Sequence, residues 1–243
     1  MQIRIAKFIS NMGICSRRDA EKLIALGKVK INNKVISSPV HFVLESDVIS
    51  VNEGEISTIT PKMWIYYKPT MVITSHKDER KTVFKEVKKY IKEHVISIGR
   101  LDYMSEGLLI LTNSPQIAHF MENPRNKIPR TYMVLLNKSI NKYEISQIQN
   151  GLKIDKMEYK PCILNYQNSF QQHEGHWIKI TLYEGKNREI RRIFSYMKCK
   201  ILKLIRISYG DISLDEIKPG NVMQIKQSIV NNLLTISKPK TDK

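Results

Sequence analysis

An unbroken apolar run at residues 108–111, made only of leucine and isoleucine, places the strongest constraint on how this chain folds. A run of this kind fits a strand buried in the centre of a sheet, because a half-exposed strand alternates apolar and polar positions. Other strand-like segments surround it at residues 63–67, 71–74, 95–98, 131–136, 177–183 and 201–207. Residues 187–197 instead have helical spacing. Strands mixed with a few helices predict one α+β domain around a large sheet.

The N-terminal residues predict a separate small module. A first amphipathic helix is indicated by apolar residues at helical spacing, namely Ile5, Phe8, Ile9 and Met12. Ser16 and Asp19 match a capping box that begins a second helix, and Gly27 ends it. A short hairpin around Asn32-Asn33 and a further strand at residues 48–51 follow. We expect a compact helix–helix–strand module of about 55 residues, which is large enough to fold alone.

A break in the pattern at Pro61 separates this module from the rest of the chain. We therefore predict an N-terminal domain at residues 1–58 and a second domain at residues 62–236. The tail at residues 237–243 contains lysine and proline, and we expect it to be disordered.

The chain is strongly basic, with 40 Lys and Arg residues against 23 Asp and Glu residues and a formal net charge of +17. Such an excess favours a polyanionic partner, because each neutralised phosphate releases condensed counterions. Nucleic acid is the leading candidate and an anionic membrane surface the second, while a generic solubility charge is the alternative without a partner. Residues 4–34 and 185–206 each hold eight Lys and Arg residues, which predicts two contact surfaces on one long ligand.

Several protein classes lose support from the sequence. No apolar run approaches the roughly 20 residues of a membrane span, and the basic residues near the N-terminus argue against a secretory signal. Cys15, Cys162 and Cys199 do not suit a disulfide framework or a CxxC pair, so we expect a reducing cytoplasm. The absence of GxGxxG and GxxxxGK[ST] motifs removes the main support for a nucleotide cofactor. His173 and His176 fit a solvated loop better than a metal site, and we predict no metal.

The most informative segment is the loop that precedes the apolar run. Asp102 lies between two predicted core strands, a scaffold that holds a carboxylate still while leaving it accessible. A catalytic carboxylate is one interpretation. The other is that Asp102 caps a turn or pairs with Arg100, and the residues alone do not separate the two.

Residues 99–113, GRLDYMSEGLLILTN, resemble the active-site motif of the RsuA/RluB/RluE/RluF family of ribosomal RNA pseudouridine synthases. Further segments resemble this family in the same order, namely Lys68-Pro69, Arg130-Thr131-Tyr132, residues 184–192 (EGKNREIRR) and residues 202–210. The N-terminal module resembles the RNA-binding fold named after ribosomal protein S4. The resemblance implies an S4-like domain followed by a mixed, mainly antiparallel sheet with flanking helices, the pseudouridine synthase fold.

The resemblance also implies a reaction and its residues. A uridine of ribosomal RNA would be isomerised to pseudouridine without a cofactor, with Asp102 as the catalytic carboxylate and Arg191 as its cationic partner. Tyr132, the third catalytic residue, would stack on the flipped uracil and could serve as the base that abstracts a proton, and Leu204 would pack beneath the uracil. Whether Asp102 attacks C1′ or acts through a glycal-like intermediate stays open.

RNA contacts follow from the same resemblance. Arg100, Arg188 and Arg192 would hold phosphates or the flipped nucleotide. The N-terminal module would contact the RNA backbone through Lys7, Arg17, Arg18, Lys28 and Lys30. We favour large-subunit RNA as the target and leave small-subunit RNA open, as we do the choice between naked RNA, an assembly intermediate and a finished subunit. Nothing in the sequence requires an oligomer, so we expect a monomer.

Three other functions compete with this interpretation. A non-catalytic ribosome-binding or assembly factor suits the charge equally well, but it would not need Asp102, Tyr132 and Arg191 together. An RNA methyltransferase would need a glycine-rich methyl-donor loop, and the sequence contains none. A membrane-surface protein would need a basic amphipathic helix with bulky apolar anchors, whereas the apolar positions of residues 187–197 suit packing on a sheet.

Overall fold

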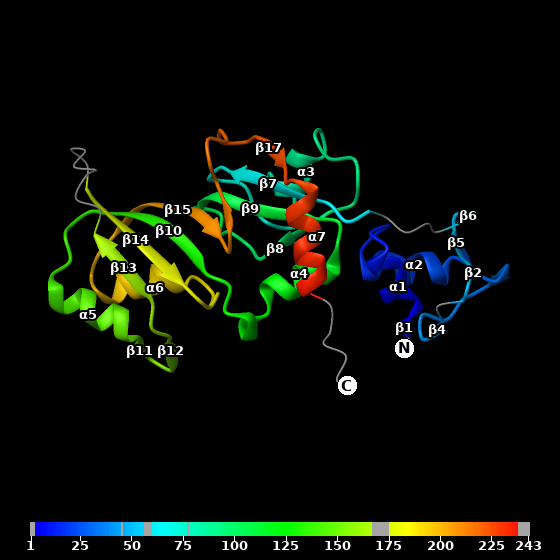
Figure 1. The fold of residues 1–243 in the computed structure, drawn as a ribbon, viewed down its shortest axis with the longest axis horizontal. Coiled ribbons are helices and arrows are strands. Elements are labelled where there is room, and N and C mark those ends of the chain that lie inside the picture. The colour runs from blue at the N-terminus through cyan, green and yellow to red at the C-terminus, as the bar shows by residue number, and fades with distance from the viewer. Residues whose placement is uncertain (1–2, 45, 56–59, 77, 167–174, 238–243) are drawn as a thin grey trace.

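The structure, a computed structural model, describes residues 3–44, 46–55, 60–76, 78–166 and 175–237. The molecule is elongated, with the N-terminal helices and small sheets at one end and a long sheet with helices along the rest (Figure 1). The predicted α+β class is confirmed.

The described residues form seven α-helices and a short 3-10 helix. The helices are α1 Ile5–Asn11, α2 Arg17–Ala25, α3 Val83–Val87, α4 Pro115–Glu122, α5 Lys142–Asn150, α6 Glu189–Tyr196 and α7 Gln227–Ile236, with the 3-10 turn at Pro124–Asn126. The strands of the N-terminal module are β1 Ile3–Arg4, β2 Val29–Ile31, β3 Lys34–Val35, β4 Phe42–Val43, β5 Ile49–Val51 and β6 Gly54–Glu55. The remaining strands are β7 Met63–Lys68, β8 Ile96–Ile98, β9 Glu106–Thr112, β10 Arg130–Leu136, β11 Leu152–Ile154, β12 Met157–Tyr159, β13 Ile163–Tyr166, β14 His176–Leu182, β15 Ile201–Tyr209, β16 Ile212–Ser213 and β17 Val222–Gln224.

The N-terminal module packs α1 and α2 beside a four-stranded sheet of order β3-β2-β5-β6, with β1 and β4 paired separately. Ser16 caps α2 as predicted, because its Oγ accepts a hydrogen bond from the backbone N–H of Asp19 at 3.2 Å. Asn32 and Asn33 both have positive φ angles, which a two-residue hairpin turn requires. The buried core of this module draws on residues between Ile5 and Val51.

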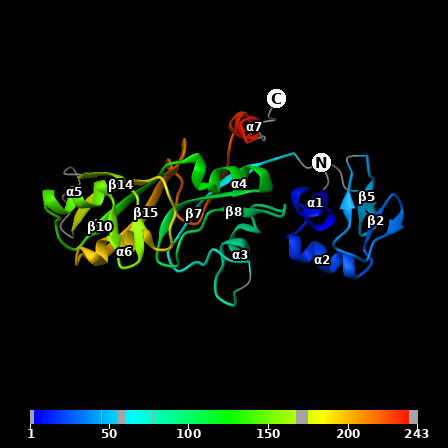
Figure 2. The ribbon, with the colours of Figure 1, turned by 90° about the horizontal axis from the view of Figure 1, so that it is seen from below.

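Strand β9 lies inside the large sheet, whose order is β13-β14-β10-β15-β9-β7-β17. All seven of its residues are buried. Leu108 and Ile110 belong to the core on the side of α4 and α7, whereas Leu109 and Leu111 belong to the core on the side of α3. Because both faces are covered, the strand is apolar at successive positions, as the sequence predicted. Figure 2 shows α4 and α3 on opposite sides of this part of the sheet.

The other half of the large sheet is formed by β13, β14, β10 and β15, and it packs against α5 and α6. The two halves meet where β15 pairs with β9 in parallel, with Arg206 opposite Gly107. Every other pairing in the large sheet is antiparallel among the described residues. The expectation of a mixed, mainly antiparallel sheet is therefore confirmed.

The expectation of a strand at residues 71–74 is wrong. This segment has only an isolated bridge between Ile73 and Thr82, and Met71 has a positive φ of 63°. Its backbone and side chains bond to the loop that carries Asp102, which leaves no continuous edge for a neighbouring strand. Helices α3, α4, α5 and α7 were not predicted.

Two expectations fall partly outside the described residues, namely the disordered tail at 238–243 and the loop that contains His173. Within the described ranges, no group of three or more His, Cys, Asp or Glu side chains could hold a metal ion. None of the helices described is long and apolar enough to cross a membrane.

Candidate active site

Asp102 lies on the loop between β8 and β9, so the half-buried β8 and the fully buried β9 fix the two ends of the loop. Gly99 opens the loop with a φ of 68°, and its N–H donates to Glu122 Oε1 at 2.6 Å. A tight turn follows, in which the Ser105 N–H donates to the Asp102 carbonyl oxygen at 3.0 Å. The Asp102 side chain is half-buried at the surface of this turn.

Lys68 supports the loop from the buried end of β7. Its side chain is fully buried at the end of β7, and its Nζ donates to the carbonyl oxygens of Ser105 at 2.8 Å and Pro69 at 2.9 Å. Burial lowers the pKa of Lys68 to about 8, although Asp102 and Glu106 favour its charged form. A buried ammonium thus holds the end of the loop in place.

The segment after Pro69 continues this support. The Met71 N–H donates to the Tyr103 carbonyl oxygen at 2.7 Å, and Thr74 Oγ1 donates to the Leu101 carbonyl oxygen at 2.9 Å. These bonds explain why the segment follows the loop instead of joining the sheet.

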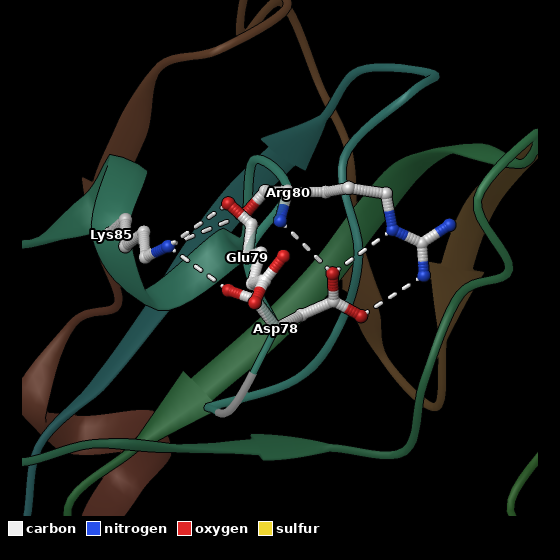
Figure 3. Close-up of polar contacts among 4 residues, drawn as sticks. All are labelled: Asp78, Glu79, Arg80 and Lys85. Atoms are coloured by element: carbon white, nitrogen blue, oxygen red, sulfur yellow. Dashed lines mark hydrogen bonds and ion pairs between the residues drawn. The ribbon is translucent and has the colours of Figure 1, made fainter.

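Asp78, Glu79, Arg80 and Lys85 form a polar turn (Figure 3), which contacts the same loop at Tyr103. Asp78 accepts two hydrogen bonds from the Arg80 guanidinium, at 2.9 and 3.0 Å, and Lys85 Nζ donates to the Asp78 carbonyl oxygen at 3.0 Å. The Arg80 guanidinium carbon lies 5.7 Å from the centre of the Tyr103 ring. The turn therefore gives the loop a cationic neighbour at the surface.

Arg191 connects helix α6 to the Asp102 loop. Its Nη2 donates to the Met104 carbonyl oxygen at 2.9 Å and to Ser105 Oγ at 3.1 Å. Its Nε lies 3.9 Å from Asp102 Oδ2, and this buried atom has no hydrogen-bond partner among the described residues. The pKa of Arg191 is lowered, mainly because the side chain is partly buried. The negative charge of Asp102 raises this pKa, and the positive charge of Arg188 lowers it further. The guanidinium is thus bound to the loop through Nη2, while its Nε faces the Asp102 carboxylate without a hydrogen-bond partner among the described residues.

A cavity of about 430 Å³ opens beside this pair, at the junction of the two halves of the large sheet. Tyr132 on β10 and Leu204 on β15 line it together with Asp102. Tyr132 is half-buried and Leu204 is buried, so the cavity has an aromatic and an aliphatic surface near the carboxylate. A volume of this size is within the range that binds small organic groups.

Basic side chains dominate the polar lining of the cavity. They are Arg100, Arg130, Lys186, Arg188, Arg191 and Arg206, against the acidic side chains Asp102, Glu122, Glu184 and Glu189. Such a lining favours an anionic ligand that also presents a planar apolar face.

The sequence interpretation did not assign Arg130 and Arg206 to this site. Arg130 is buried, donates to Tyr209 Oη at 2.7 Å and stacks on the Tyr209 ring. Arg206 is 2% exposed, and its Nε donates to the Leu108 carbonyl oxygen at 2.7 Å. The sequence signal for Arg206 was its position in a strand between two isoleucines. Because charged side chains are rarely buried, that pattern predicts an exposed arginine instead.

Not all expected residues gather at the cavity. Arg100, Arg188 and Arg191 line it, whereas Arg192 is exposed on α6 and is not part of the lining. The N-terminal basic cluster, Lys7, Arg17, Arg18, Lys28 and Lys30, lies on the separate module, where all but Lys30 are exposed. Arg17 also lines a second cavity of about 190 Å³ that includes His94 of the larger domain.

Comparisons with known proteins agree with this architecture. Residues 62–196 match the RNA pseudouridylate synthase family, and residues 3–49 match the S4 domain family. An uncharacterized RNA pseudouridine synthase of Rickettsia typhi is 46% identical over 235 residues, which cover 96% of this chain and 95% of the relative. Ribosomal large subunit pseudouridine synthase B of Bacillus subtilis is 30% identical over 235 residues, which cover 96% of each chain.

A solved structure described as a pseudouridylate synthase has the same fold. It superposes with a TM-score of 0.67 at 25% sequence identity and covers 95% of this chain and 99% of its own. Since the synthase match extends over more than half of the residues and the relatives align along nearly the full length, the chain belongs to the RNA pseudouridylate synthase family and carries an S4 domain before its synthase domain.

Proposed function

We propose that this isomerase converts one specific uridine of ribosomal RNA, in the large subunit, to pseudouridine, with Asp102 as the catalytic carboxylate. The observation that supports the role of Asp102 best is its position 3.9 Å from the guanidinium of Arg191, on a loop held by Lys68, at the edge of a basic cavity. The reaction requires an ionised carboxylate beside the ribose, and a neighbouring cation favours that form.

The isomerisation breaks the N1–C1′ bond and forms a C5–C1′ bond, while C5 loses its proton to solvent and N1 takes one up. Asp102 is placed to stabilise or to bond the ribose carbon while the uracil turns. Tyr132 and Leu204 offer the uracil an aromatic face and an apolar floor in the same cavity. Because no redox change occurs, the atoms balance without a cofactor.

The target uridine must leave its base stack before Asp102 can reach it. Phosphates that flank the flipped nucleotide would lie against Arg100 and Arg188 at the cavity rim, and Arg192 extends the basic surface along α6. The N-terminal basic cluster would contact a more distant part of the RNA backbone, with an affinity that depends on salt.

The choice of large-subunit RNA rests on the relatives. Two of them, from Bacillus subtilis and Buchnera aphidicola, are named ribosomal large subunit pseudouridine synthase B and are 30% and 32% identical to this chain. Since the proposed substrate is ribosomal RNA, we propose that the protein acts in the cytoplasm and as a monomer.

A direct test uses unmodified large-subunit and small-subunit RNA, each incubated with the purified protein. Pseudouridine is then mapped by carbodiimide derivatisation and reverse-transcription stops. We expect one new stop in the large-subunit RNA and none in the small-subunit RNA. A stop in the small-subunit RNA alone would contradict the proposed target, and no stop in naked RNA, subunits or assembly intermediates would contradict the proposed function.

A further inference from the structure

Two buried carboxyl groups flank the turn that leads into helix α6. Glu184 follows β14 and is 7% exposed, and Glu189 is the first residue of α6 and is 3% exposed. Residues 185–188 connect them, and both side chains lie at the edge of the cavity.

The partners of the two carboxyl groups are unequal. Glu184 Oε1 accepts a hydrogen bond from the Lys160 N–H at 2.8 Å, and its Oε2 pairs with Lys186 Nζ at 2.8 Å. Glu189 Oε2 accepts only from the Lys186 backbone N–H, at 3.0 Å. Glu189 Oε1 is buried, and no described group donates a hydrogen bond to it.

The charges around the pair are also unbalanced. One cation, Lys186, serves two carboxyl groups, and its ammonium binds Glu184. From the neighbouring elements, Cys162 faces Glu189 as a neutral thiol, since burial and then Glu189 raise its pKa to about 12. Arg130 lies near the turn, but its guanidinium donates to backbone carbonyls and to a tyrosine hydroxyl.

One proton on Glu189 Oε1 would give this buried atom a hydrogen bond to donate and would remove the excess negative charge of the pair. Both carboxyl groups lie against Lys186, Glu189 at its backbone N–H and Glu184 at its ammonium, so a protonated Glu189 Oε1 can donate to the neighbouring Glu184. If Glu184 and Glu189 were both ionised, two neighbouring buried carboxylates would instead repel each other.

We propose that Glu184 and Glu189 share one proton and that the neutral Glu189 is a positioning residue, which holds the 185–188 turn and thereby Arg191 for the isomerisation. Burial and the neighbouring Glu184 raise the pKa of Glu189 to about 7, in agreement with the geometry. Hydrogen bonds from Lys160 and Lys186 outweigh the effect of burial on Glu184 and keep its pKa below the ordinary value.

The turn controls Arg191 through the start of the helix. Arg188 has a left-handed φ of 54°, a conformation that a non-glycine residue adopts only when its surroundings fix it. Arg191 lies in the first turn of α6, two residues beyond Glu189, and makes its bonds to the Asp102 loop from there. Loss of the shared proton would loosen the turn and move the guanidinium away from the loop. This inference rests on the proposed function of Arg191.

The test compares the wild type with Glu189→Gln, whose amide reproduces the hydrogen bonds of the protonated acid at every pH. The measurement is kcat for tritium release from labelled RNA between pH 6 and pH 8. With a pKa of about 7, the protonated fraction of the wild type falls about tenfold over this range. We therefore expect the ratio of kcat for Glu189→Gln to kcat for the wild type to rise about tenfold. Glu216→Gln, an exposed change on a different segment, should follow the wild type.

Identical pH profiles of the wild type and Glu189→Gln would overturn the inference. A second measurement does not depend on activity, because a protonated carboxyl group has its own infrared carbonyl band. The wild type should show this band at pH 6, lose it by pH 8, and lack it in Glu189→Gln. If the band is absent at pH 6, the shared proton is refuted, whatever RNA the enzyme modifies. If the band titrates but no RNA is modified, the proposed function fails and the shared proton stands.

Discussion

Replacement of Gly107 by alanine should break the junction between the two halves of the large sheet. Gly107 follows the Asp102 loop in β9, has a φ of 102° and pairs in parallel with Arg206 of β15. A Cβ at this position would lie 2.4 Å from the Arg206 carbonyl oxygen and 2.9 Å from the Arg206 nitrogen. Both contacts are to backbone, so the only relief is to separate the two strands.

The size of the effect follows from two contributions. An alanine with this φ costs about 1–3 kcal/mol of backbone strain. Separation of the strands loses one or two hydrogen bonds of about 1 kcal/mol each. The sum is roughly 2–5 kcal/mol, which lowers the melting temperature by roughly 10 °C for a chain of this size.

Gly220→Ala is a matched control. Gly220 also has a positive φ, of 83°, but a Cβ there would meet no atom within 4 Å. It should therefore cost only the backbone strain, about 1–3 kcal/mol, without the loss of strand hydrogen bonds. Thermal unfolding followed by tryptophan fluorescence reports on the junction, because Trp64 is buried in β7 beside β9. Equal melting temperatures for Gly107→Ala and Gly220→Ala would refute the argument from close approach.

Three further predictions concern charge. The unfolding free energy of Glu189→Gln minus that of the wild type should rise by roughly 1–3 kcal/mol between pH 5 and pH 8. The reason is that the folded wild type retains a proton on Glu189 that the unfolded chain loses near pH 4.5, so the wild type loses stability as the pH rises. Urea titrations that give the same difference at both pH values would argue against this prediction. Double replacement of Arg17 and Arg18 by alanine should reduce the slope of log affinity against log salt concentration by about 1.5 for single-stranded RNA. An unchanged slope would mean that neither arginine contacts the RNA. Arg191→Lys should lower kcat about 100-fold with little change in RNA affinity, because a lysine ammonium cannot bond Ser105 and face Asp102 at the same time. A kcat within fivefold of the wild type would contradict the role of the guanidinium.

The parts of the fold that the sequence predicted are those in which local pattern and tertiary environment agree. Strand β9 is apolar at successive positions because two cores cover it, and α2 begins at a serine whose side chain caps it. Helix α4 carried comparable signals, with Ser114 as its cap and Pro115 in its first turn, and these could have been used.

The errors and omissions arise where distant contacts decide the structure. Residues 71–74 have strand-like side chains, but hydrogen bonds from Met71 and Thr74 to the Asp102 loop prevent strand pairing. The buried Arg206 and the Glu184–Glu189 pair depend on partners that only the folded chain brings together. Asp102 and Arg191 were named through a family resemblance, because no local pattern connects residues 89 positions apart in sequence.

The central claim is that Asp102 carries out the isomerisation, and it is tested most directly by tritium release from RNA labelled at uracil C5. Formation of the C5–C1′ bond must expel that label. Large-subunit RNA should lose one equivalent of tritium with the wild-type protein and none with Asp102→Asn, while both proteins bind the RNA equally in filter assays. Tritium release by Asp102→Asn at a rate comparable to that of the wild type would contradict the account.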